Sequence, residues 1–249
     1  MYINTKGLVL RVVAYKESSV ILTVLTDTLG KVTCQAKGAK RKGSRLAPFV
    51  QLLAFSDMTL YERAGRYTLT EASEIEMFEG LRYDLEKLSL GSYFAQMLEA
   101  VSDEDAPNAQ ILSTGLNALY LLSEGKKPPE LIKPAFEMRI MCLAGFAPIA
   151  EACSACGKED IENPRFDLQG GNITCRDCDS AEGETAALCK DSLAALRHVI
   201  NSESKRVFSF SLSGNAQRRF YNACEKYVQI QLERRFDTLD YYKNIQEIK

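Results

Sequence analysis

The sequence lacks the features that would carry a chain into or across a membrane. Its longest nearly apolar run, from Ile140 to Ala150, is too short to span a bilayer. No basic segment followed by an apolar one opens the chain, so we expect no secretory signal. These absences favour a soluble intracellular protein. The 249 residues contain no internal repeat or low-complexity tract and are enough for two or three domains.

The common signatures of catalysis are also missing. The chain has no GxxxxGK[ST], GxGxxG, GxSxG or HExxH motif. Its one histidine, His198, lies in a predicted helix without a cysteine or serine partner in a recognisable motif, which favours a structural role. Carboxylate pairs such as Asp103 and Asp105 fall in an acidic turn, which is typical of surface residues. We therefore expect no enzyme, although a nucleic-acid-modifying activity stays open as an alternative.

Negative charge is absent from one stretch of a slightly acidic chain. The formal net charge is −2, yet residues 1–80 hold 11 Lys and Arg against 8 Asp and Glu. No Asp or Glu falls between Lys31 and Arg45, and Gly38 and Gly43 predict a loop there. The loop is either a solvated turn or a phosphate-binding loop, because Lys and Arg neutralise a nucleic-acid backbone. Its five cations are Lys37, Lys40, Arg41, Lys42 and Arg45.

The first 80 residues have the pattern of a small β domain. Five short strand-like segments follow one another with no helix long enough for a βαβ crossover, which predicts an OB-type barrel. The segments are Gly7–Tyr15, Ser19–Thr28, the strand after Lys31, Phe49–Glu62 and Tyr67–Glu76. Five aromatic residues can either stack on bases or fill the core, and the core is the commoner role. They are Tyr15, Phe49, Phe55, Tyr61 and Tyr67.

Helical periodicity begins after Gly80. Apolar spacing of about 3.6 residues predicts helices over Leu81–Val101, Ile111–Leu122, Pro134–Leu143, 185–201 and Gly214–Arg235. The third helix is apolar nearly all round, so we expect it to be central, with Arg139 meeting a carboxylate or reaching the surface. Ser213 is a candidate N-cap of the last helix. Arg218 and Arg219 lie near the start of this helix, and we expect their side chains to be exposed to solvent. We predict a short strand or extended segment at Arg206–Leu212 and a loosely ordered tail to Lys249.

The most specific signal is a pair of CxxC motifs. Cys153 and Cys156 are separated by 18 residues from Cys175 and Cys178. This spacing matches a four-cysteine zinc site, because each CxxC turn directs two thiolates at one point. The intervening Pro164–Thr174 looks like a hairpin, which makes the layout that of a zinc ribbon. A redox dithiol or two disulfides are the alternatives.

A zinc ion held by four thiolates has no coordination position left for a substrate or water, so we expect one structural Zn²⁺. Metal binding would then supply the folding energy of a segment too short to hold its own core. The other four cysteines fall at isolated or apolar positions, where they are expected to act as small packed side chains. They are Cys34, Cys142, Cys189 and Cys224.

In the order of its segments, the chain resembles the RecO family of bacterial DNA-repair and recombination mediator proteins. The resemblance covers nearly the whole length, and any one segment alone would be weak. The matching segments are KGLVLRVVAYKESSVILTVLT at Lys6–Thr26, AKGAKRKGSRLAPF at Ala36–Phe49, LYERAGRYTLTEA at Leu60–Ala72, FEMRIMCLAGFAP at Phe136–Pro148 and CSACG…GGNITCRDC at Cys153–Cys178. Some members of the family lack the cysteines, so zinc is not required for the family's function in general.

The resemblance implies an α+β protein with an N-terminal OB-type β-barrel, followed by a helical domain into which the zinc ribbon is inserted. The expected domains are 1–79, 80–249 and, within the second, 151–179. It also implies a non-catalytic protein of the bacterial cytoplasm and nucleoid that binds single- and double-stranded DNA. Such a protein anneals complementary strands and assists RecA loading onto DNA coated by single-strand-binding protein.

The implied partners are RecR, the C-terminal tail of single-strand-binding protein and, indirectly, RecA. Only the basic motif is carried over as DNA contacts: Lys37, Lys40, Arg41, Lys42 and Arg45. A groove for the partner tail beside Arg218 or Arg219 is a guess. The rival hypothesis is a zinc-ribbon interaction scaffold whose basic loop binds an acidic protein partner.

Overall fold

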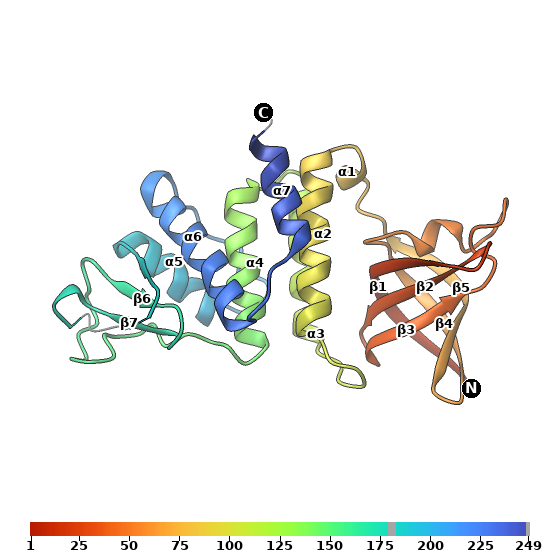
Figure 1. Cartoon of the computed structure of the whole chain (residues 1–249), viewed down its shortest axis with the longest axis horizontal. Helices are drawn as coiled ribbons and strands as arrows, with labels where there is room; N and C mark the ends of the chain where they lie inside the picture. Colours follow the sequence, from red (N-terminus) through yellow and green to blue (C-terminus); the bar gives the residue numbers. More distant parts are fainter. Residues whose placement is uncertain (179–182, 248–249) are drawn as a thin grey trace. The chain divides into compact units, whose positions relative to one another are not determined.

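The chain folds into two compact units (Figure 1). The computed structural model describes residues 1–178 and 183–247. Unit 1 contains residues 1–124 together with the described residues from Phe236 onward, and unit 2 is Gly125–Arg235. Residue 179, the last of the expected ribbon, and the final two residues of the expected tail lie outside the described residues. Of the helices that the structure describes, none combines the length and apolar character needed to cross a bilayer.

Unit 1 begins with a closed five-stranded barrel in the order β1-β2-β3-β5-β4, which confirms the predicted OB-type fold. All neighbouring strands are antiparallel except β3 and β5, where Cys34 lies opposite Tyr67 in a parallel pair. The alternation after Lys31 places Val32, Cys34 and Ala36 in the barrel core. The strands are β1 Tyr2–Tyr15, β2 Ser19–Thr26, β3 Gly30–Ala36, β4 Phe55–Arg63 and β5 Arg66–Glu76.

The segment predicted as one strand over Phe49–Glu62 is shorter in the structure. Its first residues belong to a 3-10 helix, η1 (Ala47–Val50), and the strand starts only at Phe55. Pro48 stands at the start of η1, where its missing N–H costs nothing, whereas a central strand would have needed that donor. The first strand, in contrast, is longer than predicted, because Tyr2 to Leu8 also pair with β4.

The helices of unit 1 are α1 (Glu79–Arg82), α2 (Leu85–Val101), α3 (Ala109–Ser123) and α7 (Asp237–Glu247). The single helix predicted from Leu81 is broken at Asp84, whose carboxylate accepts the N–H groups of Glu86 and Lys87 and caps α2. The predicted loose tail is wrong: α7 lies along α2 (Figure 1) and buries Leu239 and Tyr242.

Unit 2 is built on α4 (Pro129–Leu143), which packs against α5 (Lys190–Asn201) and α6 (Gly214–Gln231). Ten residues of α4 are buried, in agreement with the predicted central helix. The helix starts five residues earlier than predicted, at Pro129, and continues through Pro134, which cannot donate to the carbonyl of residue 130.

A small three-stranded sheet carries the cysteines of unit 2. Its order is β7-β6-β8, with β6 at Arg165–Asp167, β7 at Asn172–Thr174 and β8 at Thr185–Ala187. Residues 185–187 were predicted as helix, but they pair with β6 and α5 starts only at Lys190. The segment 206–212 is a turn followed by irregular chain, and α6 ends at Gln231, earlier than predicted.

Candidate nucleic-acid interface and cysteine site

The basic loop, Lys37 to Arg45, leaves the end of β3 as a chain of tight turns. The N–H of Arg41 donates to the carbonyl of Gly38 at 3.0 Å, and the N–H of Ser44 donates to the carbonyl of Arg41 at 3.0 Å. Gly38 and Gly43 have φ of +67° and +79°, a conformation that favours glycine. The base of the loop is tied to the β1–β2 turn, because the N–H of Lys40 donates to the Ser18 carbonyl at 3.0 Å.

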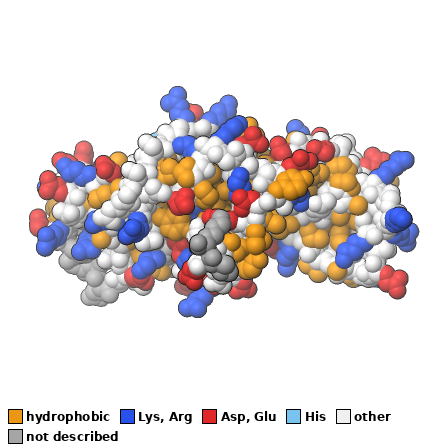
Figure 2. Space-filling model, turned by 90° about the horizontal axis from the view of Figure 1, so that it is seen from above, with side chains coloured by type: hydrophobic (Ala, Val, Ile, Leu, Met, Phe, Trp, Pro, Cys, Tyr) orange, Lys and Arg blue, Asp and Glu red, His pale blue; other side chains and the backbone are white. Residues whose placement is uncertain are grey.

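All five cations of the basic loop are exposed. Within the part of the chain that the structure describes, none of them forms an ion pair with a carboxylate. Figure 2, in which the barrel lies at the right, shows Lys and Arg side chains projecting from its surface. Lys31 behaves differently: its Nζ donates to the Glu99 carbonyl of α2 at 2.9 Å. The loop therefore presents uncompensated positive charge to solvent without help from Lys31.

None of the five candidate stacking aromatics is fully buried. Tyr15 is 38% exposed, and Phe49, Phe55, Tyr61 and Tyr67 are half-buried. Tyr67 packs against the barrel core, in agreement with the commoner role. Two basic residues of the β4–β5 hairpin, Arg63 and Arg66, are also exposed and were missed. The sequence could have revealed them, because the turn residues Ala64 and Gly65 stand between these two arginines.

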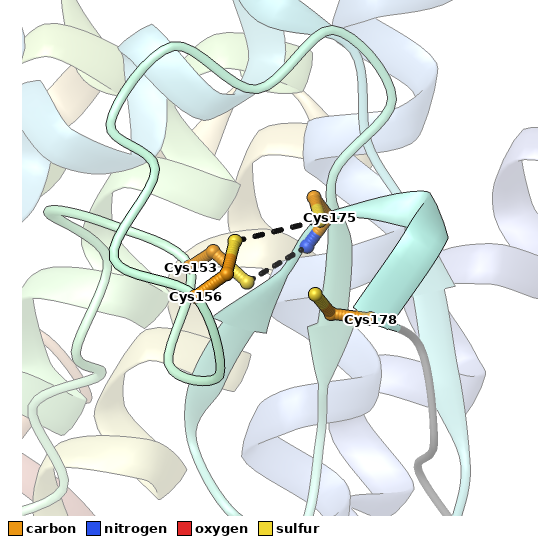
Figure 3. Close-up of side chains that lie close together, drawn as sticks. All are labelled: Cys153, Cys156, Cys175 and Cys178. Carbon is orange, nitrogen blue, oxygen red and sulfur yellow. Dashed lines mark hydrogen bonds between the residues drawn. The ribbon is translucent and has the colours of Figure 1, made fainter.

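The four CxxC cysteines converge from two loops onto one point (Figure 3). Cys153 and Cys156 come from the loop before β6, while Cys175 follows β7 and Cys178 ends the 3-10 helix η2 (Arg176–Cys178). Their four Sγ atoms lie within 4.8 Å of one another, and those of Cys156 and Cys175 are 3.9 Å apart. A tetrahedron with Zn–S bonds of about 2.3 Å has an edge of about 3.8 Å. The residues present therefore fit a tetrahedral metal ion.

Backbone hydrogen bonds shape the cysteine site. Gly157, with φ of +73°, donates its N–H to the Cys153 carbonyl at 2.9 Å and closes the first turn. The N–H of Ser154 donates to the Ile173 carbonyl at 2.8 Å, which holds this turn against the β6–β7 hairpin. The predicted hairpin is present, with Gly171 at φ +65° in its turn. The spacing of the motif thus leads to the convergence that it predicted.

The thiols affect one another's protonation. Burial opposes ionisation of Cys153, but N–H groups of Cys175, Cys156 and Ala155 outweigh it and lower the pKa of Cys153 to about 6. Hydrogen bonds with Cys175 and Cys156, together with their charge, raise the pKa of Cys178 to about 12. Several thiolates this close repel one another, so the cluster needs a cation to be fully ionised.

The remaining cysteines lie apart from this cluster. Cys34 and Cys224 are buried, and burial raises the pKa of the Cys34 thiol to about 12 and that of Cys224 well above its usual value. Cys142 and Cys189 are half-buried, and burial raises the pKa of Cys142 to about 11. Three of the four thus have the properties of packed thiols. Cys189 differs, because hydrogen bonds from Ser192 outweigh burial and lower its pKa.

Other singled-out residues have structural partners. His198 contacts the Arg206 carbonyl through Nε2 at 2.9 Å and lies against Phe210. Among the described residues Arg139 meets no carboxylate, and it is only half-buried; its Nη1 donates to the Ile200 carbonyl at 3.0 Å. Arg219 donates to the Leu188 carbonyl at 2.9 Å, whereas Arg218 is exposed.

Comparison with known proteins gives matches along the chain. The family model for the Recombination protein O N terminal matches residues 1–78, and that for the Recombination protein O C terminal matches residues 82–240. This chain belongs to the RecO family. It is 30% identical to the DNA repair protein RecO of Acetivibrio thermocellus, over 100% of this chain and 99% of that protein.

Further relatives show similar agreement. The DNA repair protein RecO of Alkaliphilus metalliredigens is 26% identical over 98% of this chain and 100% of that protein. The DNA repair protein RecO of Rhodopirellula baltica is 32% identical over 78% of this chain and 73% of that protein. The predicted family is therefore confirmed, and the barrel lies within the part matched by the N-terminal RecO model.

Proposed function

We propose that this RecO-family protein is a non-catalytic DNA-binding protein whose basic loop holds the phosphate backbone. The observation that carries the proposal is the set of five exposed cations without carboxylate partners among the described residues. Cations without groups that recognise base edges provide affinity but no sequence preference. The contacts are made by Lys37, Lys40, Arg41, Lys42 and Arg45.

Charge neutralisation explains how such a protein anneals complementary strands. Two strands repel each other through their phosphates, and a loop that neutralises both lowers this repulsion. The protein assists RecA loading onto single-stranded DNA coated by single-strand-binding protein, together with RecR and through the tail of the single-strand-binding protein. Family membership supports these partners, and the unpaired cations support the DNA contact.

Fluorescence anisotropy of a labelled single strand over a salt series tests the proposal. If about four phosphates are neutralised, log K falls with log salt with a slope of about −3. Replacing the five loop cations by alanine weakens binding equally for all sequences and flattens the slope. A variant with Lys205→Gln and Arg235→Gln, two exposed cations of unit 2, shows the effect of removing positive charge away from the loop.

The alternative is an interaction scaffold whose basic loop binds an acidic protein. Absence of DNA binding by the wild-type protein at low salt would favour it, whereas full DNA affinity in the five-alanine variant would show that the loop does not hold the DNA. A direct measure of the proposed activity is the annealing rate of two complementary oligonucleotides coated with single-strand-binding protein. We expect the wild type to increase this rate and the five-alanine variant to leave it near the rate measured without protein.

We also propose that Cys153, Cys156, Cys175 and Cys178 hold one structural Zn²⁺. The tetrahedral fit of the sulfur atoms supports this assignment. Zinc would supply folding energy to the ribbon, and it has no open position for catalysis. Native mass spectrometry should find one zinc ion per chain in the wild type and none in a Cys153→Ser/Cys156→Ser variant.

A further inference from the structure

The strand β1 has a neighbour on both sides for only part of its length. It pairs with β2 as far as Tyr15, but on its other side only Tyr2 to Leu8 pair with β4. Val9 makes the last backbone bonds on that side, with Leu53 and Ala54. Among the described residues, Arg11–Tyr15 form no backbone hydrogen bond there. Every second residue of this stretch, the open edge, therefore points its N–H and C=O away from β2 without a partner strand.

The side chains of the open edge are mostly apolar and exposed. All five residues are exposed, and they include the large hydrophobic residues Val12, Val13 and Tyr15. The one charge belongs to Arg11, whose Nε lies 3.1 Å from Oε1 of Glu99 in α2. β-branched and aromatic residues favour strand pairing, and the stretch contains no carboxylate or proline that would prevent it.

A second unpaired edge of the barrel is built differently. The strand β5 pairs with β3 only at Tyr67 and Thr68, so its later residues also lack a neighbour on that side. Glu71 and Glu74 are exposed in this part of β5, and two register shifts interrupt its pairing with β4. Charges and bulges keep a strand edge from pairing with another chain. The edge of β5 is thus protected against pairing, whereas the open edge of β1 is not.

A second copy of this chain fits the open edge by symmetry. We propose that two copies pair antiparallel through this edge, about a twofold axis at Val13. Val13 then lies opposite the partner's Val13, and no like charges face each other across the pair. Because both copies use the same edge, the assembly closes at two chains and leaves no unpaired apolar edge. The remaining cross-strand pairs are Val12 with Ala14 and Arg11 with Tyr15, the latter a cation beside an aromatic ring.

The size of this interface sets the strength of the dimer. It contains about five residues a side, whereas a stable interface of standard size has about 20–30. We therefore expect a weak dimer with a dissociation constant on the order of 10–100 μM, which forms only when the chains are concentrated.

Pairing at the open edge would also bring two basic loops into one assembly. The basic loop is bonded to the β1–β2 hairpin, since Lys40 N–H donates to the Ser18 carbonyl and Gly38 N–H donates to Ser19 Oγ at 3.2 Å. A dimer therefore offers one loop to each of two DNA strands. This consequence rests on the proposed function, but the pairing itself does not.

Sedimentation velocity of the full chain over a wide concentration range tests the pairing. Val13→Lys and Val13→Glu each place two like charges opposite each other at the twofold axis, and each should weaken self-association at least about tenfold. An equal mixture of the two variants places Lys opposite Glu and should associate again. The matched control is Ile149→Lys in unit 2, where Ile149 is 64% exposed and the change should have no effect.

A second pair of variants tests the register and does not depend on Val13. In the proposed pairing, Tyr15→Glu places a carboxylate opposite the partner's Arg11, twice in each dimer, and should tighten association at least about threefold. Tyr15→Lys places a like charge there and should weaken it. Circular dichroism and thermal unfolding show whether each barrel is intact. If the Val13 variants do not fold, the opposite effects of the two Tyr15 changes decide.

Two results would overturn the inference. One is a wild-type protein that stays monomeric at every concentration, which would leave the open edge to an extended segment of another protein. The other is a dimer that both Val13 variants still form, because that dimer must use another surface. Failure of the wild type to bind DNA would overturn the proposed function and leave the sedimentation result unchanged.

Discussion

Lys133 carries its charge inside unit 2, where none of its side chain is exposed. Its Nζ lies 2.8 Å from carboxylate oxygens of both Glu137 and Glu225, and 4.0 Å from the centre of the Tyr221 ring. Burial alone would lower the pKa of the ammonium group, but the carboxylates and Tyr221 outweigh burial and raise it. The lysine is therefore charged within α4, and its partners are what makes its burial possible.

Removing this one charge should destabilise unit 2. Lys133→Met leaves the carboxylate of Glu137 buried without its ammonium partner, and we expect the free energy of unfolding to fall by about 3–5 kcal/mol. The double variant Lys133→Met/Glu137→Leu removes the two fully buried charges, leaving only Glu225, whose side chain is 12% exposed, and should recover most of that loss. Urea denaturation followed by circular dichroism measures both effects. If the urea midpoint of Lys133→Met equals that of the wild type, the charge of Lys133 does not stabilise unit 2.

Sequence patterns could not reveal this network. Arg139 attracts attention in the same helix, yet it is half-buried and bound to a backbone carbonyl. The buried charge belongs to Lys133, and one of its partners, Glu225, lies 92 residues further along the chain. Such a pairing depends on how α4 and α6 pack, and the local spacing of apolar residues carries no information about that packing.

The strands and cysteine turns were more accessible to prediction because their signals are local. Alternation along β3 places Val32 and Cys34 in the core, and CxxC spacing alone brings thiols together. Elements that depend on distant contacts were missed. The strand β8 exists through its pairing with β6, and α7 exists through its packing on α2.

The helix α7 closes unit 1 through a few buried side chains. Phe236 is 1% exposed and meets the ring of Tyr93 in α2 edge to face, with centroids 5.4 Å apart. Thr238 also hydrogen-bonds to Gln96 of α2. Buried apolar side chains at the start and on one face of this mostly polar segment thus hold it against α2.

Truncating the first of these anchors should loosen α7. We expect Phe236→Ala to lower the free energy of unfolding by about 3–5 kcal/mol, because a large cavity opens beside Tyr93. The matched control is Tyr241→Ala, since Tyr241 lies within α7 but is 53% exposed and should change stability by less than about 0.5 kcal/mol. Hydrogen exchange of the α2 amides reports the local effect. Equal effects of the two changes would show that α7 is not anchored at Phe236.

The two units make the cysteine site and the basic loop separable. The proposed zinc site lies in unit 2, while the basic loop belongs to unit 1. Metal binding requires deprotonated thiols, so the affinity for zinc falls as the pH is lowered. Loss of the metal should therefore affect the ribbon first.

Chelation of the metal should unfold the ribbon and leave DNA binding intact. We expect the amides of β6 and β7 to lose protection from hydrogen exchange, while single-strand affinity changes less than about twofold. The Cys153→Ser/Cys156→Ser variant should show the same pattern without chelator, and Cys189→Ser, a cysteine outside the cluster, should not. A large loss of DNA affinity on chelation would show that the ribbon takes part in binding.

The return of the chain to unit 1 after Arg235 has a consequence during synthesis. Unit 2 is one continuous segment and can fold as soon as it has left the ribosome, whereas unit 1 must wait for Phe236 and α7. The face of α2 that packs against α7 is therefore made early but is covered only after all of unit 2 has been synthesised. Until then, the face of α2 that α7 will cover is exposed to chaperones and proteases.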